Sequence, residues 1–282
     1  MPFLIAVNLI SIFGFATFSL HPSLLARFAW APPIFSVSYP LFAQLQILIG
    51  FLVFAREAIR RSGGRFARLF GASVLVSFLM EYCGTTWGIP FGKYSYTSLL
   101  GWKILGQVPV LIPLSWFFMS VPSFLIADQL LGQRSSRPGR ILLGSFLLLS
   151  WDLTLDPAMS HLTPFWEWEN KSGPPFHIPP LNLAGWMITG CLILSLFELS
   201  GLRSGPSWNR DRFPLRFYLA NLLLPFGISL FGGIWAPIAT TVLLASGCWI
   251  LGSSTGGLQS FRGGFRGESG ADAPLETSSK PA

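Results

Sequence analysis

Five acidic side chains stand inside stretches of sequence that are otherwise strongly apolar. They are Glu81, Asp128, Asp152, Asp156 and Glu198. A carboxylate in such a setting is costly to bury, and it is by default a candidate for function. We expect Asp128 and Glu198 to lie near the ends of their helices, as solvated groups that face nearby arginines. The other three are the candidates for chemistry.

Asp152 and Asp156 have the spacing of two neighbours on one helix face. Four residues correspond to about one turn, so both side chains project in the same direction. Pro157 follows directly and should end or kink the helix. Two carboxylates this close in an apolar medium do not both ionise easily, so one should keep a proton and could act as a general acid. The alternative is that both brace the broken helix end through hydrogen bonds to loop amides.

Two long connecting segments, 81–96 and 166–186, are rich in aromatic residues, glycine and proline. An aromatic belt at the membrane interface would account for Trp166 and Trp168. It accounts less well for Tyr94, Tyr96 and Asn182, which we expect near the carboxylates. His161 is either a proton relay beside the aspartates or a solvated loop histidine.

The elements that must position these groups are membrane-spanning helices. Only 11% of the 282 residues are charged and 51% are hydrophobic, whereas a soluble domain carries about 25% charged residues. The chain holds 26 Phe and 11 Trp, which excludes a disordered protein. The three cysteines are far apart and form no metal-binding or disulfide pattern. We attribute the net charge of +7 to basic residues on one side of the membrane, so we do not expect nucleic acid as a partner.

Apolar segments long enough to cross a bilayer predict an all-α bundle of about eight transmembrane helices. They lie near 3–20, 35–55, 66–83, 107–131, 140–159, 183–201, 214–231 and 233–251. Most of the 19 lysines and arginines fall on one side of this bundle, the exceptions being Arg27, Lys93, Lys103 and Lys171. The positive-inside rule then places both termini in the cytoplasm. We therefore expect a transmembrane domain over 1–251 and a disordered cytoplasmic tail over 252–282.

The order of short motifs resembles the membrane-embedded carotenoid hydratase family of the CruF type. The first motif is E-x-x-G-x-x-x-G-x-P-F-G-x-Y-x-Y from Glu81 to Tyr96, and VPVLIPLSW follows, ending at Trp116. Then come WDLTLDP at 151–157, WEW at 166–168, and P-x-x-N-x-x-G-W from Pro179 to Trp186. Each motif is weak alone, but the five in this order are specific. The resemblance covers roughly residues 35–190.

The resemblance implies a hydro-lyase of carotenoid biosynthesis. It would add water across the terminal 1,2 double bond of an acyclic carotenoid end, of the lycopene or γ-carotene type, through a tertiary carbocation. Asp152 or Asp156 would supply the proton, and the other aspartate or Glu81 would orient the water. The aromatic and polar groups expected to line the substrate site are Trp151, Tyr94, Tyr96, Asn182, Trp186 and His161. No metal or other cofactor is expected.

The same resemblance implies a multi-pass protein of the prokaryotic inner membrane. Its expected partners are the carotenoid, water and membrane lipid, with other enzymes of the pathway as further candidates. Two other classes of protein stay open. An intramembrane prenyltransferase would hold magnesium diphosphate on acidic motifs, but it normally needs two of them. The second is a lipid transporter or scaffold without enzymatic activity.

Overall fold

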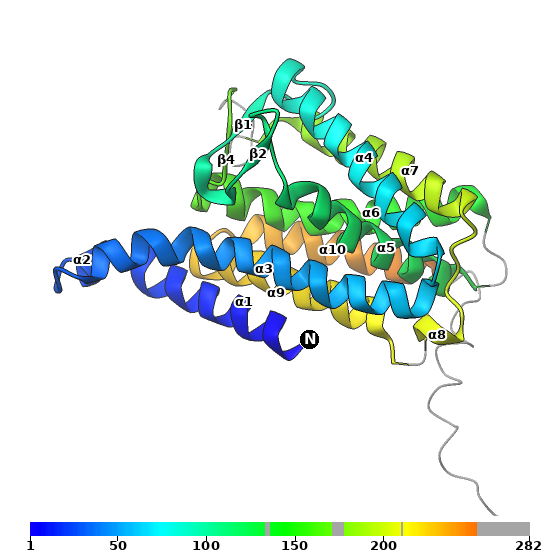
Figure 1. Cartoon of the computed structure of the whole chain (residues 1–282), viewed down its shortest axis with the longest axis horizontal. Helices are drawn as coiled ribbons and strands as arrows, with labels where there is room; N and C mark the ends of the chain where they lie inside the picture. Colours follow the sequence, from blue (N-terminus) through cyan, green and yellow to red (C-terminus); the bar gives the residue numbers. More distant parts are fainter. Residues whose placement is uncertain (133–135, 171–177, 210, 253–282) are drawn as a thin grey trace, which may run out of the picture.

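The protein is a helical bundle in the computed structural model, which describes residues 1–132, 136–170, 178–209 and 211–252 (Figure 1). The long helices are α1 (Pro2–Gly14), α3 (Ala31–Ser62), α4 (Arg65–Trp87), α5 (Leu111–Leu131), α6 (Arg137–Asp156), α7 (Pro180–Leu199), α9 (Phe213–Phe231) and α10 (Trp235–Gly252). The short helical pieces are η1 (Phe15–Ser19), α2 (Pro22–Leu25), η2 (Ser98–Leu100), η4 (Pro157–Leu162) and α8 (Pro206–Asn209). Four short strands are β1 (Tyr94–Tyr96), β2 (Lys103–Ile104), β3 (Val108–Pro109) and β4 (Trp166–Trp168).

Each of the eight predicted apolar segments forms a helix. Seven of these helices in the described chain are long and apolar enough to cross a membrane, which makes this an integral membrane protein. The eighth, α10, has a shorter apolar stretch, Trp235–Leu251. The count of eight spans and the orientation of the termini therefore stay predictions. The predicted tail lies outside the described residues, apart from Gly252.

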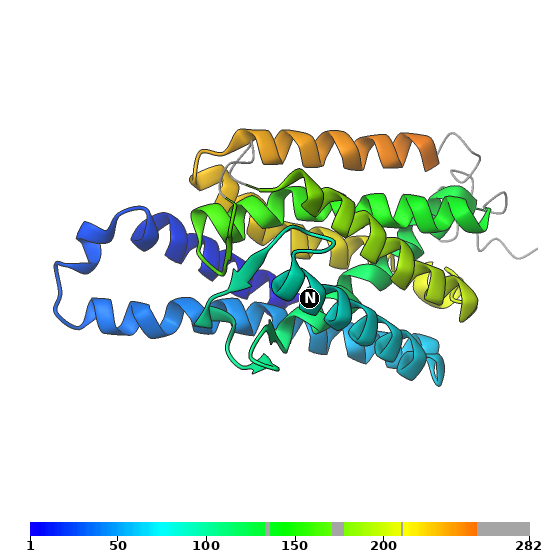
Figure 2. The same ribbon diagram turned by 90° about the horizontal axis from the view of Figure 1, so that it is seen from above.

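Helix α5 forms the centre of the bundle because its sequence is apolar on every face. Four fifths of its span is buried, 83%, against 17% for α3. It packs against α3, α4, α6, α7 and α9. Figure 2 shows α10 along one side of the bundle and α3 along the opposite side, so these outer helices present apolar side chains outward. Such a surface suits a hydrocarbon environment.

Strands β1 and β4 join the two aromatic segments at one end of the bundle (Figure 1). They pair antiparallel, with Tyr94 opposite Trp168 and Tyr96 opposite Trp166. Side chains alternate along a strand, so the two tyrosines lie on one face, and that face is buried. Tyr94 also packs its ring on Trp168 at 4.9 Å. The sheet thus brings both aromatic segments over the same point of the bundle.

Helix α6 ends at Asp156, as the position of Pro157 predicts. The chain continues without a break into the π-helical turn η4. Asp152 and Asp156 therefore lie on the last turn of α6, beneath the β1–β4 sheet.

Candidate active site

One cavity collects all three candidate carboxylates. It has a volume of about 100 Å³ and lies among α3 to α7 and the β1–β4 sheet. The predicted residues that line it are Glu81, Tyr94, Tyr96, Trp151, Asp152, Asp156, Asn182 and Trp186. The acids are almost fully buried, with 5% of Glu81 and 2% of each aspartate exposed. This arrangement matches the sequence prediction that the three acids converge.

Glu81 is held by three donors from two different elements. Its Oε2 accepts hydrogen bonds from the hydroxyls of Tyr94 and Tyr96, the latter at 2.7 Å. Its Oε1 accepts one from the Trp116 indole at 2.8 Å. Burial raises the pKa of both tyrosines well above the ordinary value, and the adjacent Glu81 raises it further. Both phenols therefore remain protonated and keep donating.

Asn182 links the two aspartates from α7. Its side-chain Nδ2 donates to Asp152 Oδ2 at 3.1 Å and to Asp156 Oδ2 at 2.8 Å. One amide nitrogen has two protons to donate, so it can satisfy both contacts. The two carboxyl groups are thereby held in fixed positions on the cavity wall.

Asp156 has two further donors that the sequence did not indicate. Trp166 and Trp168 donate their indole N–H groups to Asp156 Oδ1, at 2.8 and 3.2 Å. Both line the cavity, so assigning them to an interfacial belt was wrong. Trp116 was likewise named only as part of a motif, although it binds Glu81. The W-x-W and Y-x-Y spacings could have predicted these contacts, because residues two apart in a strand point to the same face.

Indole rings form the apolar side of the cavity. Trp116 and Trp186 stack with centroids 4.2 Å apart, and Trp151 meets Trp186 edge-on at 5.9 Å. An aromatic face attracts a cation through its quadrupole. The cavity therefore combines protonatable carboxyls with surfaces suited to a positively charged intermediate.

His161 is the one predicted site residue that the structure does not bring to the cavity. It lies on η4, where it is exposed, and it does not line the cavity. It follows Asp156 by about one turn, beyond the end of α6, and its side chain lies outside the cavity wall.

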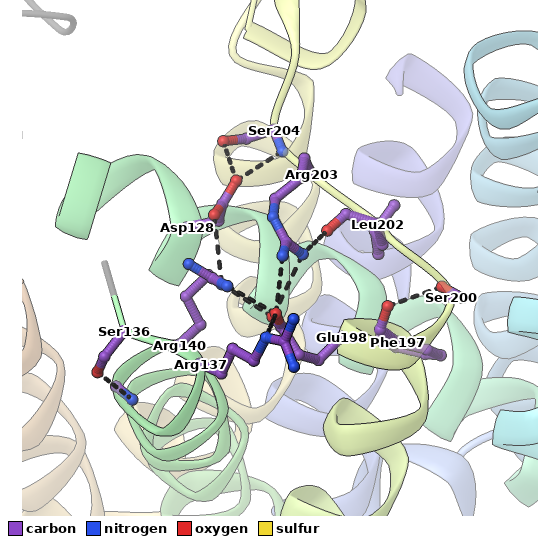
Figure 3. Close-up of polar contacts among 11 residues, drawn as sticks. Asp128, Ser136, Arg137, Arg140, Phe197, Glu198, Ser200, Leu202, Arg203 and Ser204 are labelled. Atoms are coloured by element: carbon purple, nitrogen blue, oxygen red, sulfur yellow. Dashed lines mark hydrogen bonds and ion pairs between the residues drawn. The ribbon is translucent and has the colours of Figure 1, made fainter. Parts of the chain in front are cut away.

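Asp128 and Glu198 lie in a separate charged cluster (Figure 3). Glu198 accepts from Arg140 at 2.6 Å and from Arg203 at 2.7 Å. Asp128 accepts from the backbone N–H of Ser204 at 2.7 Å and lies 3.6 Å from Arg140. The expected arginine partners are present, but the prediction of solvated helix ends was wrong, because both acids are only 8% exposed. The connection after α7 contributes Arg203 and Ser204 to this cluster.

No group of three or more His, Cys, Asp or Glu is arranged to hold a metal ion within the part of the chain that the structure describes.

Comparisons with known proteins converge on one family. A family model described as carotenoid biosynthesis protein matches residues 42–248. A protein of Haloarcula japonica named bisanhydrobacterioruberin hydratase is 33% identical over 180 residues. That alignment covers 62% of this chain and spans 60% of the length of the relative. No solved structure matches the chain.

Proposed function

The chain belongs to the carotenoid biosynthesis protein family, and from this membership we propose that it hydrates the terminal 1,2 double bond of an acyclic carotenoid end group. The observation that carries the proposal is the single cavity with three buried carboxyls and an indole wall. The hydratase name of the similar archaeal protein supports the same reaction class. Substrates of the lycopene or γ-carotene type present such an end.

The reaction requires a proton donor, a cation-stabilising surface and a water molecule. A carboxylic acid protonates C2, the less substituted carbon of the double bond, and the electron pair of the bond forms the new C–H bond. The tertiary cation at C1 lies against the rings of Trp116, Trp151 and Trp186. Water then adds to C1 and gives up one proton to a carboxylate, which yields a tertiary alcohol. General acid catalysis of this kind typically contributes about 10²- to 10⁴-fold.

We assign the acid role to Asp152. The two oxygens of Asp156 already accept three hydrogen bonds, two of them from indoles, which can only donate. This pattern suits an ionised group that takes the proton from water. Among the described residues, Asp152 accepts a single hydrogen bond, from Asn182, and so has room to carry a proton. A proton returned from Asp156 to Asp152 would complete the cycle.

Glu81 has a supporting role in this scheme. Its three donors hold its side chain in place on α4. From there it can orient the water and add negative charge near the cation. Phe91, Tyr94 and Trp168 cover this side and limit the access of bulk water.

The composition of the wall favours a hydrocarbon over a diphosphate ester. Among the described residues that line the cavity, none is basic, and most are aromatic or aliphatic. A prenyltransferase would have to neutralise a diphosphate here, next to three carboxyls. Release of diphosphate by the purified protein with magnesium would support that alternative.

The test is hydration by purified protein in lipid nanodiscs that contain an acyclic carotenoid, run in D₂O without metal or nucleotide. We expect a product heavier by one water, with one deuterium on carbon that survives washing in H₂O. Expression in a lycopene-producing bacterium should give the corresponding unlabelled alcohol. A protein that inserts normally yet leaves the pigment mass unchanged in both assays would refute the proposal.

A further inference from the structure

A second cavity lies directly beside the first. It has a volume of about 230 Å³ and lies between α1–η1, α3, η4 and α9. Four residues line both cavities: Ala43, Met159, Phe165 and Leu224. The two spaces therefore adjoin across a thin wall of side chains, and the second one leads away from the carboxyls.

The second cavity is aromatic along its whole length. A run of rings connects Phe18 to Phe35 at 5.7 Å, Phe35 to Tyr39 at 5.7 Å, and Tyr39 to Phe165 at 5.6 Å. Phe165 belongs to both cavities, so this run leads to the indole-lined site. The hydroxyls of Ser11 and Ser38 bond to carbonyls of their own helices, Val7 and Phe35. The groove thus presents mainly apolar surface to an occupant.

The groove has the shape of a channel rather than a compact pocket. Its lining residues run from Ile10 to Phe18 on α1–η1 and from Phe35 to Ala43 on α3. At 1.5 Å per residue, each wall is roughly 12 Å long. Helices α1 and α3 are in contact, and they diverge toward η1 (Figure 2). A narrow, extended chain suits such a space.

We propose that the second cavity binds the polyene chain of the same substrate, while the terminal double bond lies in the first cavity. This inference rests on the proposed function and adds a binding subsite to it. The aromatic run favours a rigid conjugated chain, which loses little conformational freedom on binding. The lining residues that the two cavities share would bring the end of that chain toward Asp152 once those side chains give way.

Gly14 offers a direct test of the subsite. It lines the second cavity, and a Cβ built there meets no atom within 4 Å. Gly14→Trp should fill the groove, whereas Gly14→Ala should leave it open. Gly71→Trp is the matched control, because Gly71 on α4 is equally free of neighbours and lines neither cavity.

The first measurement is kcat/KM for an acyclic carotenoid in nanodiscs. We expect Gly14→Trp to lose about tenfold or more, equivalent to about 1.4 kcal/mol. Gly71→Trp should stay close to the unchanged protein. Equal kcat/KM for Gly14→Trp and Gly71→Trp would overturn the inference and leave the groove to membrane lipid.

The second measurement is the pigment that co-purifies with protein, scored by absorbance, in an Asp152→Asn background. Adding Gly14→Trp should lower the bound pigment, and adding Gly71→Trp should not. Equal pigment in the two would count against the subsite. If the unchanged protein hydrates no carotenoid, the proposed function fails, while this binding assay still decides whether the groove holds a polyene.

Discussion

The three carboxyls differ in how many of their hydrogen-bonding positions are already taken. Glu81 and Asp156 each accept three hydrogen bonds, and Asp152 accepts one among the described residues. Three chemically identical carboxyl groups thus differ in the hydrogen bonds that the surrounding side chains donate to them. This difference could not be predicted from the spacing of the two aspartates, because their donors come from β4 and α7, which are separate elements 10 to 30 residues further along the chain.

Asp152→Asn should abolish most of the activity. The amide keeps the shape of the side chain but has no carboxyl proton to transfer, so we expect kcat to fall by about 100-fold or more. Steady-state hydration in nanodiscs measures this. Asp128→Asn, in the separate charged cluster, is the control and should keep nearly normal kcat in the folded fraction. Similar kcat for the two variants would mean that Asp152 is structural.

At the scale of elements, the site depends on how closely α4 and α7 pack around the ring of Phe91. Phe91, which is 2% exposed, packs between Gly84 of α4 and Gly185 of α7. A Cβ at Gly84 would lie 2.8 Å from the Phe91 ring, and one at Gly185 would overlap it. The glycines of the E-x-x-G and N-x-x-G-W motifs therefore make room for the side chain that closes the cavity.

Gly185→Ala should displace Phe91 and distort the cavity. Overpacking of this kind typically costs about 1–3 kcal/mol. We expect a lower melting temperature in detergent and a lower kcat/KM for the carotenoid. Gly247→Ala on α10, where the added methyl meets no atom within 4 Å, should change neither. A fully active and stable Gly185→Ala protein would contradict this account of the glycine.

The elements themselves were predictable to different degrees. Each span follows from its own hydropathy, and Pro157 marks the end of α6 locally. The pairing of β1 with β4 joins segments about seventy residues apart, and nothing within either segment specifies the partner. Tryptophans at a membrane interface and tryptophans that bind a buried carboxylate have the same composition, so Trp166 and Trp168 were misassigned.

At the scale of the molecule, the candidate active site and the buried charged cluster lie at opposite ends of α6. Roughly 18 Å of helix separates Arg140 from Asp152, at 1.5 Å per residue. Arg61 forms a similar pair with Asp211 at 2.8 Å, and hydrogen bonds from Arg61 lower the pKa of Asp211. Many arginines that indicate topology thus also bind acids within the fold. The position of an arginine in the sequence does not show whether it only faces the cytoplasmic side or also binds a buried acid.

Arg140→Met should destabilise the protein more than it lowers activity. It leaves Glu198 and Asp128 buried with less positive charge nearby, which typically costs about 3–5 kcal/mol. Thermal unfolding in detergent measures the loss. Arg137→Met is the control, since the Arg137 side chain is 78% exposed, at 3.7 Å from Glu198, and exposed pairs contribute at most about 1 kcal/mol. Equal melting temperatures for the two would show that the buried cluster is not stabilising.

Because both cavities lie among apolar helices, the relevant substrate concentration is the one in the membrane. A substrate that reaches the carboxyls along α1 and α3 arrives from the hydrocarbon phase and never from bulk water. In the proposed reaction, the rate then follows the mole fraction of carotenoid in the bilayer, so added lipid dilutes the substrate even when the total amount in the sample is constant. Encounter is a search in two dimensions, and the thickness and fluidity of the membrane become kinetic variables of the reaction.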